Sequence, residues 1–159
     1  SIIPDRATAM MVIMASEVGV LPVKPEQSVL LVEQTTPMAL WVNQGHYHPG
    51  ILWRKFYEKR PDVASVETTM GFDEDDRRRV AERIGECDVV VITNFHWRRG
   101  DNGNDFVKEL HERHPDKPIV VVTNNPYPLT LDDAYGTVVM TYGVSARALE
   151  RVMELVLGT

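Results

Sequence analysis

The sequence predicts an α/β fold: a three-layer α/β/α sandwich whose mostly parallel sheet has roughly five to six strands. The first observation is that runs rich in Val, Ile and Thr alternate with amphipathic segments along the whole chain. The second is that the amphipathic segments are ~10 to 13 residues long, the length of a crossover helix between parallel strands. The third is that no internal repeat or low-complexity linker interrupts 159 residues, a length typical of one domain. We therefore expect residues 1–159 to form a single α/β domain.

The first half of the chain is expected to alternate between strand and helix. The expected elements are a strand or first helix at Ala9–Ala15, a strand at Ser28–Glu33, a helix at Ile51–Arg60, a short strand at Val63–Thr69, a helix at Asp73–Gly85 and a strand at Cys87–Thr93. The helix at 73–85 has acids in its first turn and bases after them, an order that suits the helix dipole. Its apolar spacing predicts that Val80, Ala81 and Ile84 are buried.

The second half repeats the alternation. The expected elements are a helix at Asp105–His114, strands at Ile119–Thr123 and Gly136–Thr141, and a closing helix at Ser145–Leu157. Pro115 ends the first of these helices, Ser145 is a suitable N-cap for the second, and Gly158 lies just beyond its end. This order of elements is typical of flavodoxin-like or Rossmann-like folds.

Composition and charge exclude several classes of protein. The formal net charge of -6 argues against nucleic acid as a partner, and the basic run Arg77–Arg79 follows four acids, as on a solvated helix face. No apolar stretch approaches the ~20 residues that cross a bilayer, and no signal peptide is visible, so we expect no membrane partner. Cys87 is the only cysteine, which excludes an intramolecular disulfide. Its position before a strand indicates a small buried residue rather than a nucleophile.

Polar residues gather where the predicted strands end. In open α/β sheets, ligands bind outside the carboxyl ends of the strands. Those ends read Glu33-Gln34-Thr35, Thr93-Asn94-Phe95-His96, Thr123-Asn124-Asn125 and Thr141-Tyr142-Gly143. Amides, hydroxyls and aromatic rings suit sugars better than phosphates, and the chain has neither a P-loop nor a GxGxxG motif. A response regulator would need a cluster of carboxylates at these ends, where only Glu33 qualifies.

The strand at 119–123 runs into Asn124-Asn125-Pro126-Tyr127-Pro128. Pro126 forces Asn125 into an extended conformation, so the strand cannot continue directly into a helix. The two asparagines can satisfy backbone groups at the resulting turn. We interpret this segment first as a rigid loop over the sheet edge, and second as a source of Asn and Tyr side chains for a ligand or a neighbouring domain.

Two local motifs carry a resemblance to a known family. The first motif is the run KPIVVVTNNPYPL, which is followed by TVVMTYGVSARALERVMELVLGT. The second is the turn LPVKP near the start of the chain. Together they resemble the C-terminal α/β domain of family 3 glycoside hydrolases, particularly the β-N-acetylglucosaminidase (β-hexosaminidase) branch. The likeness covers nearly the whole chain in order, and the NPY loop and the LPVKP turn are its distinctive parts.

The resemblance implies a domain without its own catalytic set. In this family the nucleophilic aspartate lies on an N-terminal (β/α)8 barrel, which 159 residues cannot hold. Members that cleave glucosides take a general acid/base glutamate from the loop after the strand matched by 88–93. Residues 94–105 contain no glutamate, in agreement with the acetylglucosaminidase branch, whose catalytic histidine lies on the barrel. We therefore expect no catalytic residue and no cofactor here, with the barrel and carbohydrate as partners.

The same resemblance implies where contacts with a sugar or with the barrel would lie. The candidate residues are Asn94, His96, Trp97, Arg98, Asn124, Asn125 and Tyr127. For Trp97, packing on the barrel is the preferred interpretation over stacking on a sugar. His46 and His48 have a spacing that lets two imidazoles point together, and His96 is a conceivable third ligand. Because no cysteine or clear acid accompanies them, we expect no metal site.

Two hypotheses from different classes stay open. The first is a domain of a sugar-cleaving enzyme that is inactive alone, present either as a fragment, which a start at Ser1 without methionine suggests, or as a natural stand-alone remnant. The second is a stand-alone flavodoxin-like module that binds a small polar ligand or a protein partner. A domain separated from its barrel would expose an apolar patch, whereas a self-sufficient module would show a closed pocket. The residues expected in such a patch are Met38, Leu40, Trp41, Phe95 and Trp97. The compartment, bacterial cytoplasm or secreted, is left open.

Overall fold

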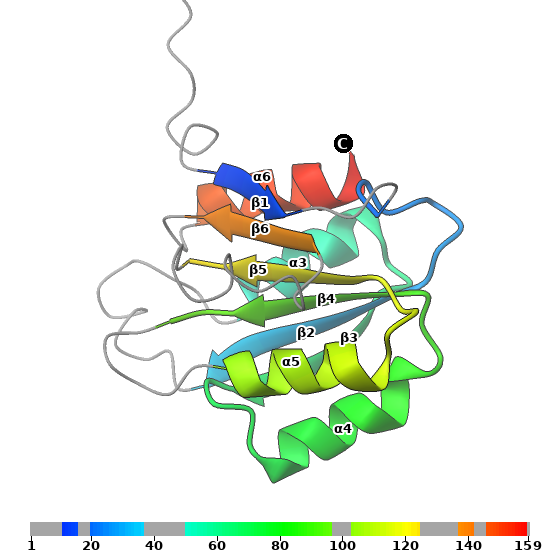
Figure 1. Cartoon of the computed structure of the whole chain (residues 1–159). Coiled ribbons are helices and arrows are strands. Elements are labelled where there is room, and N and C mark those ends of the chain that lie inside the picture. Colours follow the sequence, from blue (N-terminus) through cyan, green and yellow to red (C-terminus); the bar gives the residue numbers. More distant parts are fainter. Residues whose placement is uncertain are drawn as a thin grey trace, which may run out of the picture.

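The computed structural model describes residues 11–15, 20–36, 50–96, 103–124, 137–141 and 146–158. These residues form one sheet with helices on both faces, which confirms the predicted three-layer α/β sandwich (Figure 1). None of the helices in these ranges is long and apolar enough to cross a membrane.

The sheet has six strands in the order β1-β6-β5-β4-β2-β3. Their bounds are β1 Met11–Ala15, β2 Val29–Thr36, β3 Ala64–Thr69, β4 Val89–Asn94, β5 Ile119–Thr123 and β6 Thr137–Thr141. All neighbouring pairs are parallel except β1 and β6, which are antiparallel. The chain passes from β2 outward to β3 and then returns across β2 to β4. This reversal of strand order creates a topological switch point between the carboxyl ends of β2 and β4.

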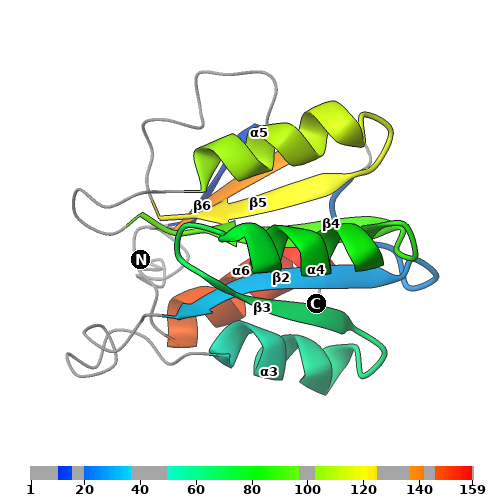
Figure 2. The same ribbon diagram turned by 90° about the horizontal axis from the view of Figure 1, so that it is seen from below.

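Four helices cover the two faces of the sheet in the described ranges. They are α3 Ile51–Lys59, α4 Glu74–Ile84, α5 Asn104–Arg113 and α6 Ala146–Leu157. Helices α3 and α6 lie on one face of the sheet, and α4 and α5 lie on the other (Figure 2). Their buried side chains pack in two separate apolar clusters, one for each pair of helices. The predicted elements differ from the observed ones mainly by a few residues at their ends, and Ala9–Ala15, for which strand and helix were both open, contains a strand.

The central strands are buried on both faces, as their unbroken apolar sequences predict. Every residue of β4 and of β5 is buried. Because successive side chains of a strand point to opposite faces, Val89 and Val91 enter the α3/α6 cluster, whereas Val90 and Ile92 enter the α4/α5 cluster. The sheet thus forms the shared wall of two cores.

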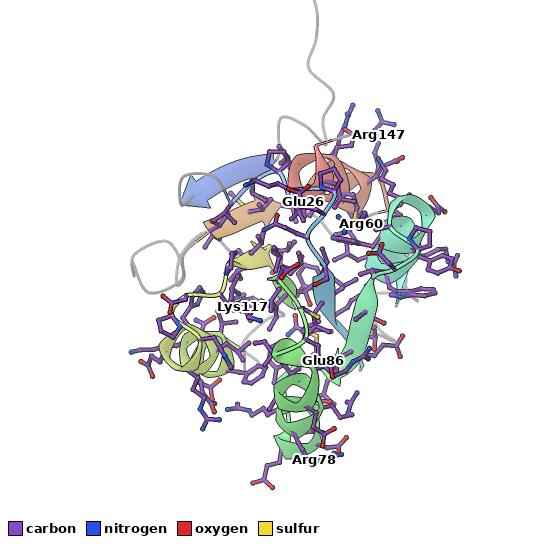
Figure 3. The ribbon with its side chains drawn as sticks, turned by 90° about the vertical axis from the view of Figure 1, so that its right-hand side faces the viewer. Glu26, Arg60, Arg78, Glu86, Lys117 and Arg147 are labelled. Atoms are coloured by element: carbon purple, nitrogen blue, oxygen red, sulfur yellow. The ribbon has the colours of Figure 1, made fainter. Side chains whose placement is uncertain are left out.

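Helix α4 begins with a capping box between Asp73 and Asp76. Burial alone would raise the pKa of the Asp76 carboxyl. Hydrogen bonds from Thr69 and from the Asp73 N–H, together with the Arg79 guanidinium, outweigh burial and lower that pKa. The predicted solvated basic face is confirmed for Arg78, which lies on the outer side of α4 and pairs with acids of the same helix (Figure 3). Arg77 and Arg79 are only partly exposed.

The prediction that Ala81 is buried is wrong. Val80 and Ile84 are buried on α4, but Ala81 is exposed. Its position is about 100° around the helix from Val80, and this rotation carries it off the narrow stripe that faces the sheet. Arg77, also on α4, reaches across to α5, where it pairs with Asp105 and Glu109.

Gly103, directly before α5, gives a test of this packing. A Cβ at Gly103 would overlap the ring of Phe72, which is buried and lies 5.0 Å from the Phe106 ring, centroid to centroid. We expect Gly103→Ala to lower the free energy of unfolding by about 1–3 kcal/mol, the usual cost of overpacking, as measured by urea denaturation. Gly85→Ala is the matched control, because a Cβ there meets nothing within 4 Å. Equal stabilities of the two variants would contradict the packing described.

Candidate functional site

The carboxyl ends of β2, β4 and β5 meet at one edge of the sheet, beside the switch point. Each of these ends carries a carboxamide side chain: Gln34 on β2, Asn94 on β4 and Asn124 directly after β5. In each of the three, both the amide oxygen and the amide nitrogen are engaged in hydrogen bonds within the domain. We call these three residues the edge amides.

Gln34 joins three segments. Its Oε1 accepts a hydrogen bond of 2.6 Å from the Phe95 N–H, and its Nε2 donates one of 2.7 Å to the Met70 carbonyl. Its own N–H donates to Thr93 Oγ1 at 2.9 Å. Gln34 therefore ties the end of β4 and the turn after β3 to β2, and its amide is buried in doing so.

Asn94 and Asn124 hold the chain on either side of the segment that links β4 to α5. The Oδ1 of Asn94 accepts from the Gly103 N–H at 2.9 Å, and its Nδ2 donates to Asn104 Oδ1 at 2.7 Å. The Oδ1 of Asn124 accepts from the His96 N–H at 2.8 Å, and its Nδ2 donates to the His96 carbonyl at 3.0 Å. The side chain of Asn124 thus pairs with His96 as a neighbouring strand would.

Glu33 is a buried carboxylate at the same edge, and its role was not predicted from the sequence. It is 1% exposed, and its two oxygens accept hydrogen bonds from the N–H groups of Leu52 and Trp53, at 3.1 and 3.0 Å. These donors belong to the first turn of α3, where the helix dipole favours a negative charge. Glu33 therefore caps α3 from a neighbouring strand, in place of a cap from Gly50.

His96 differs from the edge amides. Its side chain is half-buried, and its Nε2 is shielded from solvent with no hydrogen-bond partner from the described residues. Burial lowers the pKa of the imidazole below its ordinary value. The ring is therefore neutral near pH 7, with one nitrogen as a donor and the other as an acceptor.

Of the predicted contact residues, the structure joins Asn124 to His96 by hydrogen bonds, whereas Asn94 bonds to Gly103 and Asn104. Whether they touch a sugar or a barrel stays a prediction. The remaining predicted site residues lie outside the described ranges: Trp97, Arg98, Asn125, Tyr127, His46 and His48. Within those ranges no three His, Cys, Asp or Glu side chains are grouped as metal ligands.

The prediction that Phe95 belongs to an exposed apolar patch is wrong. Phe95 is 0% exposed and packs in the α3/α6 cluster. It continues the alternation of β4 beyond the end of the strand, on the same face as Val89 and Val91.

The opposite, amino edge of the sheet carries an open cleft of about 410 Å³ between the segments that enter β4 and β5. Lys117 lies there and donates to the carbonyls of Ile84 and Cys87, which places its ammonium at the carboxyl end of α4 (Figure 3). Burial raises the pKa of the Cys87 thiol. Cys87 is thus a buried thiol, as predicted, and not an activated nucleophile.

Comparison with solved structures shows which proteins share this fold. A family 3 β-N-acetylglucosaminidase from a Paenibacillus species matches with a TM-score of 0.80 and 16% identity, over 96% of this chain and 29% of that one. A β-glucosidase from Listeria innocua, solved in complex with glucose, matches with a TM-score of 0.67 and 18% identity, over 96% and 24%. The chain thus has the fold of less than a third of each of these enzymes. No protein family and no curated protein matches by sequence.

The contribution of the edge amides can be measured at Asn124. Asn124→Ala leaves the His96 N–H and carbonyl without their partner, so we expect a loss of about 1–3 kcal/mol in the free energy of unfolding. Gln27→Ala is the control, because the Gln27 amide accepts one hydrogen bond in an exposed turn. That variant should change stability by less than ~0.5 kcal/mol in the same urea titrations. A loss at Asn124 no larger than at Gln27 would contradict the structural role.

The burial of His96 predicts an acid sensitivity. Because the pKa of His96 is lower in the folded than in the unfolded chain, the unfolded chain binds the proton more readily. The contribution of the neutral ring to stability is therefore complete above the unfolded pKa of ~6.5 and is lost as the pH falls below it. Unfolding free energies at about pH 8 and about pH 5.5 should differ less in His96→Phe than in the parent chain. If the difference between the two pH values is the same in His96→Phe as in the parent chain, His96 is not the source of the acid sensitivity.

Proposed function

We propose that this chain is the non-catalytic C-terminal α/β domain of a glycoside hydrolase that releases terminal β-linked N-acetylglucosamine. In the complete enzyme it packs against an N-terminal (β/α)8 barrel and borders the sugar cleft. The observation that carries the proposal is the similarity in fold, over 96% of this chain, to part of a family 3 β-N-acetylglucosaminidase. The order of the NPY loop and the LPVKP turn in the sequence supports it.

The chemistry of the edge is consistent with a supporting role. Hydrolysis of a glycosidic bond needs a pair of catalytic groups on opposite sides of the bond. The stretch 94–105 supplies no glutamate, and both oxygens of Glu33 accept hydrogen bonds from α3. His96 is neutral and half-buried. We therefore assign catalysis to the barrel and contact to the predicted residues Asn94, His96, Trp97, Arg98, Asn124, Asn125 and Tyr127.

One observation favours the alternative of a stand-alone flavodoxin-like module. Among the described residues, Tyr57 is the one large hydrophobic side chain that is strongly exposed, at 48%. It stacks on Trp53, with ring centroids 5.1 Å apart. A surface that has lost a barrel should expose a broader apolar patch. The other residues predicted for that patch, Met38, Leu40, Trp41 and Trp97, lie outside the described ranges.

The isolated chain should not hydrolyse a chromogenic N-acetyl-β-glucosaminide, because the nucleophile belongs to the barrel. The measurement is release of the chromophore by purified chain at neutral pH, compared with buffer alone. Turnover that is abolished by a single substitution within this chain would refute the non-catalytic assignment.

The reading frame upstream of Ser1 separates the two hypotheses. A (β/α)8 barrel encoded there, with an aspartate and a histidine at the ends of barrel strands, would support the glycosidase domain. A stop codon or an unrelated domain would favour the module.

A further inference from the structure

The hydrogen bonds of the edge amides show which of the predicted contact residues in the described ranges still have a polar atom without a partner. Asn94 and Asn124 are predicted candidates for contact with a sugar or with the barrel, yet both amides are hydrogen-bonded within the domain. Among the described members of the predicted set, His96 alone retains a shielded polar atom without a partner. Among the described residues of that set, the unused hydrogen-bonding capacity therefore lies on the imidazole of His96.

A shielded polar atom without a partner is costly. Leaving a buried donor or acceptor unsatisfied costs about 1–3 kcal/mol, so native proteins rarely retain one unless a ligand, a water or a neighbouring molecule supplies the partner. Nε2 of His96 is in this situation beside the switch point, where open α/β sheets bind their ligands.

The position of His96 is fixed before any partner arrives. Gln34 accepts from the N–H of the preceding residue, Phe95, and Asn124 pairs with both backbone groups of His96. The Phe95 side chain is fully buried in the core. A contact residue whose backbone is held in this way loses little conformational entropy on binding.

The chemistry of a neutral imidazole selects the partner. Its Nε2 is a donor in one tautomer and an acceptor in the other, and a hydroxyl group satisfies both, because it can donate and accept. An anion would require the donor form, and a cation would require the acceptor form. A carboxylate, phosphate or ammonium ligand would also lose hydration without a compensating charge from the edge amides, which are neutral.

We propose that Nε2 of His96 is the ligand-contact atom of this edge and hydrogen-bonds a hydroxyl of an uncharged carbohydrate, while Gln34 and Asn124 are positioning residues that hold it. This inference rests on the proposed function and deepens it, because it assigns the contact to one atom and the three edge amides to support.

The test uses the purified chain and N-acetylglucosamine. Nitrogen-detected NMR of the histidine rings follows His96 during the titration, with the rings of His111 and His114, on α5 and at its end, as internal references. We expect a saturable shift of the His96 ring nitrogens with a dissociation constant of about 1 mM or weaker, as suits few contacts. Inorganic phosphate should cause no such shift.

Two variants separate contact from structure. His96→Gln places an amide at a reach similar to that of Nε2 and should keep the affinity, followed by backbone amide shifts, within a few-fold. His96→Phe keeps the ring shape without the hydrogen bond and should weaken binding at least ~10-fold, equivalent to ~1.4 kcal/mol. Circular dichroism and urea denaturation establish that each variant is folded. If His96→Phe fails to fold, the ring shifts of the parent chain still decide the question.

Three outcomes would overturn the inference. They are no shift of the His96 ring at saturating sugar, an equal response to phosphate, and undiminished binding by folded His96→Phe. The first would mean that a bound water satisfies Nε2. None of them bears on whether the chain lacks hydrolytic activity, so the proposed function is tested separately.

Discussion

The central strands are buried on both faces, and this burial places a strict demand on the edge where they end. A buried backbone N–H or carbonyl needs a partner even after the strand ladder stops. At the carboxyl edge the edge amides meet that demand, since Gln34 pairs with Phe95 and Met70, and Asn124 pairs with His96. These hydrogen bonds hold the turn after β3 and the residues that directly follow β4.

Local sequence was enough to predict most strands and helices, because their signals are local. Runs of Val and Ile mark β4 and β5, and apolar residues at helical spacing mark α3 and α5. The sheet order was not predicted, because pairing joins segments far apart in the chain. For the same reason the antiparallel pairing of β1 with β6 could not be read from Ala9–Ala15, a short apolar run that suits a strand or a helix.

The candidate site was predicted in position but not in detail. Asn94 and Asn124 were selected because they end buried strands, but the sequence does not state whether an amide faces a ligand or the backbone of a neighbour. The burial of Phe95 had a usable signal, since it follows Val89, Val91 and Thr93 at intervals of two and so keeps to the same face. Glu33 had no such signal, because its partners on α3 lie about twenty residues away.

The demands of support and of catalysis compete for the same side chains. General acid/base chemistry needs a titratable group that is free to exchange a proton with the substrate and has a pKa near the working pH. At this edge the carboxylate of Glu33 is committed to the positive end of α3, and the amides do not titrate. His96 titrates, but burial favours its neutral form, which suits an uncharged hydrogen bond. Among the described residues, the edge amides and the neutral ring of His96 therefore provide shape and neutral polarity at this edge.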